Sequence, residues 1–330
     1  MQKSAKILVI QTAFIGDVIL STSLAENIKQ NHPDYEIHYV VRSGNESLFD
    51  DHPFISKVWC WEKSKHKFRS LIELIVSIRK EKYKKVIVLQ RFFNAGLMAG
   101  LSKGKEIIGF RKNPVSFLFH RKIAHRYQAN LHEVDRNNAL ISHFCTNLKR
   151  RPVLYPSDFS PREIHENYYT CSPASVWYTK QFPKEKWLQL INETPKEMQV
   201  ILLGGPKDAQ LCDAILSPSI NRNVINLAGK VTLLESAAIM KKAKMNFVND
   251  SAPMHLASSV NAPVTAIFCS TVPEFGFGPL SENSYVAQTA ENLSCRPCGL
   301  HGHEKCPKGH FKCALNIETK SLMKGIRSNK

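Results

Sequence analysis

The apolar positions in the first half of the chain follow two alternating patterns. Short runs dominated by Val, Ile and Leu have strand length and occupy residues 6–11, 36–41, 57–61, 85–90 and 106–110. Between them, residues 17–30 and 68–78 carry apolar side chains three or four positions apart, the period of an amphipathic helix. Near-continuous apolar strands separated by helices are typical of a parallel sheet covered on both faces. A further helix is expected over 132–148.

The second half repeats this alternation. The expected strands are 168–173, 198–205, 224–229, 245–250 and, as the last clear one, 263–268. The expected helices begin after Pro183 and cover 207–216, 232–243 and 253–260. Between the halves, residues 150–165 contain three prolines and no periodicity, which marks a linker. Because 330 residues are long for a single core, we predict an α/β protein of two domains, 1–155 and 156–330.

Ligands of such sheets bind beyond the carboxyl ends of the strands, so the loops there are the candidate sites. The first, 12–17, contains one glycine, Gly16, followed by Asp17 at the start of a helix. It lacks the three spaced glycines of a dinucleotide-binding loop, and the chain has no P-loop, which argues against an NAD-dependent enzyme or an ATPase. Asp17 fits either of two roles. It is an N-cap carboxylate for free backbone N–H groups or a general base facing a cleft between the domains.

Two loops of the second half carry weaker signals. After the expected strand 168–173, Ser175 comes five residues before Lys180, which is either solvated or a point charge for a phosphate group. The strand that follows ends in Gly204 and Gly205. A glycine pair permits a tight turn, a positive φ or close approach of the backbone to a ligand.

The segment 249–257 has the most specific pattern. A strand ends there in Asp250 and Ser251, and a helix opens at Pro253 with His255 in its first turn. The N-terminus of a helix offers free N–H groups and partial positive charge to an anion. Ser251 and His255 can add hydrogen bonds to a diphosphate. The alternative for His255 is a buried histidine satisfied within the core.

Taken together and in this order, these loops resemble the heptosyltransferase family, glycosyltransferase family 9. The resemblance runs over nearly the whole chain, from ILVIQTAFIGDVILS through YTKQFPKEKW and LLGGPKD to NDSAPMHLA and GPL. It implies the GT-B fold, in which two Rossmann-like domains face each other and each is a parallel sheet flanked by helices. Residues 1–155 would then bind the acceptor, and residues 156–330 the nucleotide sugar.

The resemblance also implies roles for single residues. Asp17 matches the family's proposed catalytic base, and Lys180 its phosphate-binding lysine. Ser175 matches the hydroxyl residue five positions before that lysine. Gly204 and Gly205 belong to the matched donor-binding loop.

The family's donor motif, Asp-[Ser/Thr]-Gly-x-x-His, is matched by Asp250, Ser251 and His255. Ala252 stands where the motif usually has glycine, and its methyl group would narrow the approach of a diphosphate. The implied reaction inverts the anomeric carbon of heptose as it passes from ADP-heptose to the lipopolysaccharide inner core. No cofactor would be required, since Lys180, His255 and the helix N-terminus would stabilise the leaving diphosphate. No DxD-type metal motif is evident.

The charge balance adds a partner. The chain carries 45 Lys and Arg against 28 Asp and Glu, a formal charge of +17, which favours an anionic partner or serves solubility alone. Residues 63–85 and 111–126 are basic with interspersed aromatic residues. We expect them to dock on the cytoplasmic face of the inner membrane, where a phosphorylated glycolipid acceptor lies; the alternative is a solvated helix face. Asp17 interrupts the apolar start, so no secretory signal is expected and the protein should be cytoplasmic.

Four of the nine cysteines cluster near the C-terminus within residues 295–313, and the other five are expected to pack as small apolar residues. The clustered residues are Cys295, Cys298, Cys306 and Cys313. An opening C-x-x-C followed by two more thiols fits a structural zinc site, although the later spacings are not those of a standard zinc ribbon. Disulfides or packed reduced thiols are the alternatives.

Three other functions compete with the heptosyltransferase interpretation. The first is a transferase of the same fold that uses another nucleotide sugar or acceptor glycan. The second is a basic nucleic-acid-binding protein with a zinc knuckle, under which the four cleft loops have no purpose, so no nucleic-acid partner is expected. The third is a relative that has lost catalysis and acts as a scaffold, against which the presence of Asp17 and His255 argues.

Overall fold

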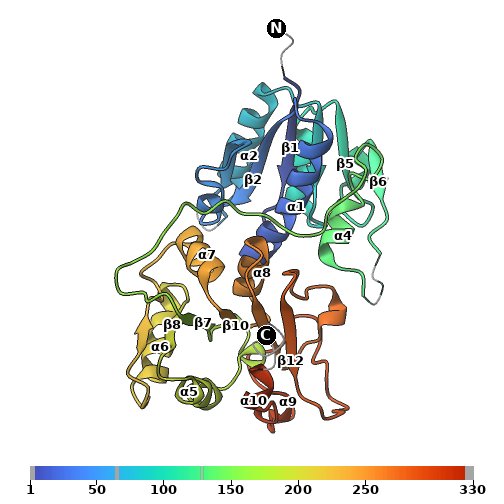
Figure 1. The fold of residues 1–330 in the computed structure, drawn as a ribbon. Helices are drawn as coiled ribbons and strands as arrows, with labels where there is room; N and C mark the ends of the chain where they lie inside the picture. The colour runs from blue at the N-terminus through green and yellow to red at the C-terminus, as the bar shows by residue number, and fades with distance from the viewer. Residues whose placement is uncertain (1–3, 64–66, 127, 129, 324–330) are drawn as a thin grey trace. The chain divides into compact units, whose positions relative to one another are not determined.

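The computed structural model describes residues 4–63, 67–126, 128 and 130–323. The chain divides into two compact units, Met1–Tyr155 and Pro156–Lys330, and the division falls within the proline-rich segment 150–165 (Figure 1). Each unit is built around its own six-stranded parallel sheet. No helix within the described ranges is long and apolar enough to cross a membrane.

The strands of unit 1 are almost wholly buried in the centre of its sheet and partly exposed at the two edges. They are β1 (Lys6–Ile10), β2 (Glu36–Arg42), β3 (Ile55–Trp61), β4 (Lys85–Val88), β5 (Glu106–Phe110) and β6 (Arg121–Ile123). Their order in the sheet is β3-β2-β1-β4-β5-β6. Since β1 is central, with Leu8 paired to His38 on one side and Val86 on the other, the loop that follows β1 opens at the middle of the sheet's carboxyl edge.

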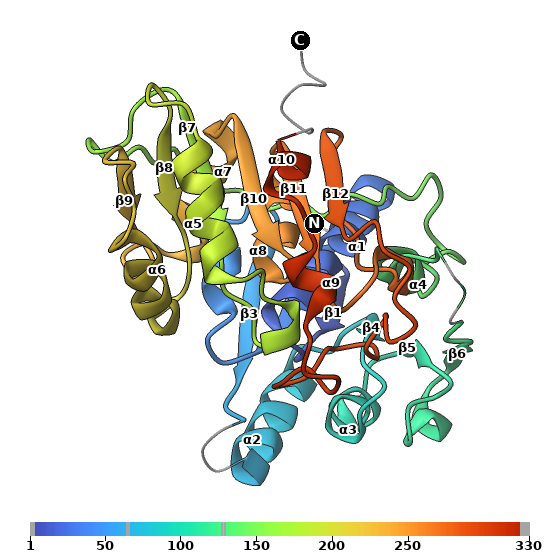
Figure 2. The same ribbon diagram turned by 90° about the horizontal axis from the view of Figure 1, so that it is seen from below.

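Helices cover both faces of this sheet. They are α1 (Ile15–Asn31), α2 (Lys67–Lys80), α3 (Phe93–Leu101) and α4 (Glu133–Asn138), with short 3-10 helices η1 (Glu46–Phe49) and η2 (Ser116–Leu118). Helices α2 and α3 pack together on one face, and α1 and α4 lie against each other on the opposite face (Figures 1 and 2). Helix α3 and strand β6 were not among the elements expected from the sequence.

The helix expected over 132–148 was wrong in its extent. Helix α4 ends at Asn138, and residues 139–144 continue as turns. The amide of Asn138 donates to the carbonyl oxygen of Lys149, and the Asn27 amide of α1 donates to Asn138 and to the same carbonyl. These tertiary bonds, together with the poor helix propensity of consecutive asparagines, end the helix early.

Unit 2 repeats the architecture with the sheet order β12-β11-β10-β7-β8-β9. Its strands are β7 (Tyr168–Ser172), β8 (Gln199–Leu202), β9 (Val224–Asn226), β10 (Met245–Asn249), β11 (Val264–Phe268) and β12 (Ser284–Gln288). Strand β12 contradicts the prediction that 263–268 is the last clear strand. It is a half-exposed edge strand with polar ends, so it lacks the apolar run of a buried strand.

The helices of unit 2 also form two layers. They are α5 (Lys184–Glu193), α6 (Ala209–Leu216), α7 (Leu233–Lys242), α8 (Ala252–Ser259), α9 (Lys312–Leu315) and α10 (Thr319–Leu322), with 3-10 helices η3 (Tyr178–Lys180), η4 (Pro206–Asp208) and η5 (Pro273–Phe275). Helices α5, α6, α9 and α10 share a core with one face of the sheet, around Trp187 and Phe247. Helices α7 and α8 pack together on the other face (Figures 1 and 2).

The five scattered cysteines divide into two kinds. Cys145, Cys171, Cys212 and Cys269 are buried, as expected of small apolar residues. Cys60 is exposed, which contradicts that expectation, because it faces outward on β3, the edge strand of the first sheet.

Candidate active site

Asp17 is the chemically distinctive residue of unit 1. It is the third residue of α1 rather than its N-cap, which is Phe14, and the backbone N–H groups of Phe14 and of Asp17 itself lower the pKa of its carboxyl group. Burial raises the pKa of Asp17 to about 7, and the negative charge of Glu133 adds to the rise, while Arg42 opposes it. A half-buried carboxylic acid that titrates near neutrality is suited to general acid–base work.

Glu133 also belongs to this site, although no motif of the sequence marks it. It is the first residue of α4, and its carboxylate pairs with Arg136 at 2.7 Å (Oε2 to Nε). Burial raises its pKa, and Arg136 lowers it. The packing of α4 against α1 is what brings Glu133 close to Asp17, so only the tertiary structure reveals the pair.

In unit 2, Lys180 and Asp250 form the centre of the candidate site. Lys180 is the last residue of η3, and its Nζ lies 2.7 Å from Oδ2 of Asp250, directly beyond β10. The same Oδ2 accepts a hydrogen bond from the Thr271 hydroxyl at 2.6 Å. Asp250 and Thr271 are almost fully buried, whereas the Lys180 side chain is 15 % exposed. A fixed ammonium group therefore lies at the carboxyl edge of the sheet, where β7, β10 and β11 end.

Asn249 holds the loop of Lys180 in place. Its side chain, fully buried, accepts a hydrogen bond from the Phe182 N–H at 3.0 Å and donates one to the Pro173 carbonyl at 2.7 Å. The bonds span both ends of the loop that contains Ser175, whose own carbonyl oxygen accepts a bond from Gln181 at 2.7 Å. The motif Asn-Asp-Ser thus contributes a structural residue as well as the expected ligand-binding ones.

Ser251 and His255 are placed by α8. Ser251 is the N-cap residue, but its hydroxyl bonds to the carbonyl oxygens of Ala174 and Asn249, each at 3.4 Å, rather than to the helix. His255 is buried in the first turns of the helix. The N-terminus of α8 thus lies beside Asp250 at the same carboxyl edge.

Of the three roles considered for the glycine pair, the structure shows the tight turn. Neither Gly204 nor Gly205 has a positive φ, whereas Gly229, whose N–H bonds to the Gly204 carbonyl, has a φ of +74°. Gly205 N–H donates to the Asp208 carboxylate at 2.8 Å, and a Cβ on Gly204 would lie 2.8 Å from the Asp208 Cβ. The pair turns tightly at the end of β8, and within the described part of the chain no hydrogen bond or ion pair joins it to Lys180 or Asp250.

The four clustered cysteines are all free thiols, and Cys295 Sγ lies 3.7 Å from Nε2 of His310. Burial and the neighbouring thiols raise the pKa of Cys298, and they raise that of Cys313 to about 11. Among the residues that the structure describes, no three His, Cys, Asp or Glu side chains are arranged to hold a metal ion. The zinc site stays a prediction from residue types.

Comparison with solved structures identifies the class of the fold. The chain aligns with Escherichia coli ADP-heptose lipopolysaccharide heptosyltransferase II over 98% of both chains, with a TM-score of 0.80 at 21% identity. It aligns with E. coli heptosyltransferase WaaC with ADP-2-deoxy-2-fluoro heptose over 98% of this chain and 100% of the other, with a TM-score of 0.74 at 17% identity. Two helix-flanked parallel sheets of this kind give the protein the GT-B fold.

The particular family follows from the sequence itself. Residues 71–306, well over half of the chain, match glycosyltransferase family 9 (heptosyltransferase). The lipopolysaccharide heptosyltransferase 1 of Campylobacter coli is 24% identical, and the match covers 98% of this chain and 98% of that one. The protein belongs to glycosyltransferase family 9, as its resemblance implied.

Proposed function

We propose that this protein transfers heptose from ADP-heptose to the lipopolysaccharide inner core, with inversion at the anomeric carbon. The observation that carries the proposal is the Lys180–Asp250–Thr271 cluster beside the N-terminus of α8. A buried carboxylate holds one lysine at the edge of the sheet, next to a helix end of partial positive charge. That arrangement suits the diphosphate of a nucleotide sugar, and the similar E. coli heptosyltransferase II is described as an ADP-heptose enzyme.

In this mechanism, Asp17 removes the proton from the acceptor hydroxyl. The oxygen then attacks the anomeric carbon from the face opposite the leaving group, and ADP departs. Lys180, His255 and the first turn of α8 stabilise the negative charge that develops on the diphosphate, without a divalent metal. A pKa near 7 keeps a large fraction of Asp17 ionised at neutral pH and still allows it to accept a proton in the transition state.

Calorimetric titration with ADP, ADP-heptose, and UDP- and GDP-sugars tests the donor assignment. We expect the adenine nucleotides to bind more tightly than the others. Lys180→Ala should lower their affinity by about tenfold to hundredfold, because it removes charge-assisted hydrogen bonds to the ligand. Preference for UDP or GDP would favour the alternative, a transferase of the same fold with another donor. No nucleotide binding at all would refute the enzymatic proposal for this site.

We further propose that the protein works as a peripheral protein on the cytoplasmic face of the inner membrane, where its phosphorylated glycolipid acceptor lies. Helix α2 supports this, because Phe68, Ile72 and Val76 recur every four residues on its outer side and are 72%, 62% and 46% exposed. Basic residues of the stretch 63–85 flank them, although 64–66 lie outside the described residues. An apolar stripe between cationic side chains fits the interface of an anionic bilayer.

Vesicle co-sedimentation tests this surface. Wild-type protein should bind phosphatidylglycerol-containing vesicles more strongly than neutral ones, and the triple serine variant of Phe68, Ile72 and Val76 should lose most of that binding. Ile220→Ser is the matched control, because Ile220 is 77% exposed but belongs to unit 2, and both basic stretches belong to unit 1. Equal binding by the triple variant and the wild type would rule out α2 as the docking surface.

A structural zinc ion on Cys295, Cys298, Cys306 and Cys313 is a separate proposal that rests on the residue types. The thiols would have to rearrange to bind it, given the arrangement of the described residues. Metal analysis of the purified protein would detect about one zinc per chain if the proposal holds, and a fourfold serine variant would carry none.

A further inference from the structure

The cysteine-rich segment, residues 295–313, runs beside the loop that carries Lys180. Thr179, directly before Lys180, is 1% exposed. Its hydroxyl oxygen accepts a hydrogen bond from the backbone N–H of His303 at 2.8 Å, and its own N–H donates to the His303 carbonyl at 3.1 Å. The Ser270 hydroxyl donates to the same Thr179 oxygen at 3.0 Å. The conformation at Lys180 therefore depends on a segment 124 positions further along the chain.

The same segment is also tied to the end of β11. Cys298 N–H donates to the Ser270 carbonyl at 2.8 Å. The Arg296 guanidinium, half-buried, donates to the carbonyl oxygens of Cys269 at 2.7 Å and Thr271 at 2.8 Å. The Thr271 hydroxyl in turn bonds to Asp250, the carboxylate partner of Lys180. The cysteine-rich segment therefore contacts the Lys180–Asp250–Thr271 cluster both at η3 and at the end of β11.

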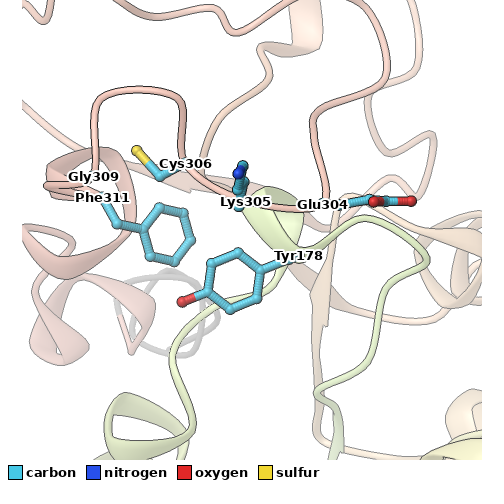
Figure 3. Close-up of a pocket in the computed structure, with 6 residues that line it drawn as sticks. All are labelled: Tyr178, Glu304, Lys305, Cys306, Gly309 and Phe311. Atoms are coloured by element: carbon cyan, nitrogen blue, oxygen red, sulfur yellow. The ribbon is translucent and has the colours of Figure 1, made fainter.

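A pair of aromatic rings extends the attachment on the outer side. Tyr178 of η3 stacks on Phe311, with ring centroids 5.2 Å apart and planes inclined by 28°. The rings help to line a cavity of about 360 Å³ between η3 and the cysteine-rich segment (Figure 3). All three residues of η3 thus lie close to this segment.

Gly302 marks the closest approach. Its φ is +77°, and a Cβ added there would lie 2.9 Å from the Thr179 hydroxyl oxygen and 3.0 Å from Cγ of Lys180. Glycine is required for the backbone conformation and also for the space that the stem of Lys180 occupies. Gly299 supplies a contrast within the same segment, because its φ is +70° but an added Cβ would meet nothing within 4 Å.

We propose that the cysteine-rich segment positions Lys180 for the donor diphosphate, with Gly302 and Thr179 as the positioning residues. The proposal rests on the function proposed above, in which Lys180 binds that diphosphate. The segment acts through the shape and hydrogen bonding of the loop, without itself touching the donor. The affinity for the nucleotide should therefore depend on the conformation of this segment.

The first test compares Gly302→Ala with Gly299→Ala by calorimetric titration with ADP. Both alanines carry the strain of a positive φ, so both should lower the melting temperature, and Gly302→Ala should lower it more because its Cβ also makes a close contact. We expect only Gly302→Ala to weaken ADP binding, by about fivefold to tenfold. This effect is smaller than the loss of activity, about a hundredfold, expected when a catalytic group is displaced by about 1 Å. Equal affinities for the two variants would overturn the proposal.

A double-mutant cycle separates positioning from general damage. If Gly302→Ala acts by moving Lys180, it should have no further effect on ADP affinity in a Lys180→Ala background. An undiminished effect in that background would show that the glycine acts elsewhere, which overturns the proposal while leaving the function of Lys180 intact. Failure of wild-type protein to bind ADP, or no effect of Lys180→Ala alone, would instead refute the proposed function and this inference with it.

Two substitutions at Thr179 supply a second route should Gly302→Ala fail to fold. Thr179→Val keeps the shape but removes the oxygen that accepts bonds from His303 and Ser270, and we expect it to weaken ADP binding several-fold. Thr179→Ser keeps that oxygen and should bind ADP within about twofold of wild type. Equal loss in both variants would contradict a role for the hydroxyl group.

Discussion

Replacement of Asp17 by asparagine should abolish turnover and stabilise the protein at the same time. The folded-state pKa of about 7 lies about 3 units above the ordinary value of 3.8. Since each unit corresponds to about 1.36 kcal/mol, the ionised carboxylate disfavours the folded state by up to roughly 4 kcal/mol. The sign follows from the raised pKa: the stabilising contribution is fully present below pH 4 and is lost as the pH rises through 7. Asparagine removes this penalty and can still accept a backbone hydrogen bond.

The two effects are measured separately. Urea unfolding should show Asp17→Asn more stable than wild type at pH 8, by about 2–4 kcal/mol, with the difference shrinking towards pH 4. ADP release from ADP-heptose in the presence of the glycolipid acceptor should fall by a factor of about 10² to 10⁴, the usual contribution of a general base. The wild-type kcat/KM should decline below a midpoint near pH 7.

Either half of this expectation can fail on its own. Turnover above about a tenth of the wild-type rate would show that Asp17 is not the base. A variant with unchanged stability at pH 8 would show that burial does not raise the pKa of Asp17 as the structure indicates. Unchanged ADP affinity is the control that the donor site remains folded, because Lys180 and its partners lie in the other unit.

Three further substitutions test individual contacts. Glu133→Gln leaves the burial of Asp17, the main cause of its raised pKa, but removes the negative charge that adds to the rise. The acid limb of the kcat/KM profile should therefore move to lower pH, and an unmoved limb would contradict their coupling. Gly229→Ala should destabilise unit 2 by about 1–3 kcal/mol in thermal or urea unfolding, because its φ is +74° and the added Cβ would lie 2.7 Å from a backbone atom. Gly44→Ala is the control, because its φ is +95° but the added Cβ meets nothing within 4 Å, so it should cost only the backbone strain. Equal losses of stability in the two variants would refute the steric argument. Asn249→Ala should lower unfolding stability by about 2–4 kcal/mol, because it leaves a buried N–H and a buried carbonyl group without their partner; a loss below about 1 kcal/mol would mean that those groups find other partners.

The local pattern was sufficient for the parts of the site that one segment supplies. Asp250, Ser251 and His255 lie together because a buried apolar strand ends where a helix begins. The sequence predicts both the strand and the helix from the short-range spacing of apolar residues. Asp17 follows β1 in the same way. Elements that lack a clear apolar pattern were missed or predicted with the wrong extent. Strand β12 is a half-exposed edge strand, and helix α4 ends where asparagine side chains form hydrogen bonds to α1.

The sequence by itself determined two α/β halves and the family to which the chain belongs, because both depend on the order of short motifs. Only the tertiary structure decided which groups surround the motif residues. Parallel strands in the order β11-β10-β7 bring Thr271, Asp250 and Lys180 to one edge, although Lys180 and Thr271 lie far apart along the chain. Likewise, the packing of α4 on α1 brings Glu133 towards Asp17, and burial there moves the pKa of Asp17 to about 7. Burial and the distance between charges depend on how the chain is folded, so they cannot be read from the order of residues alone.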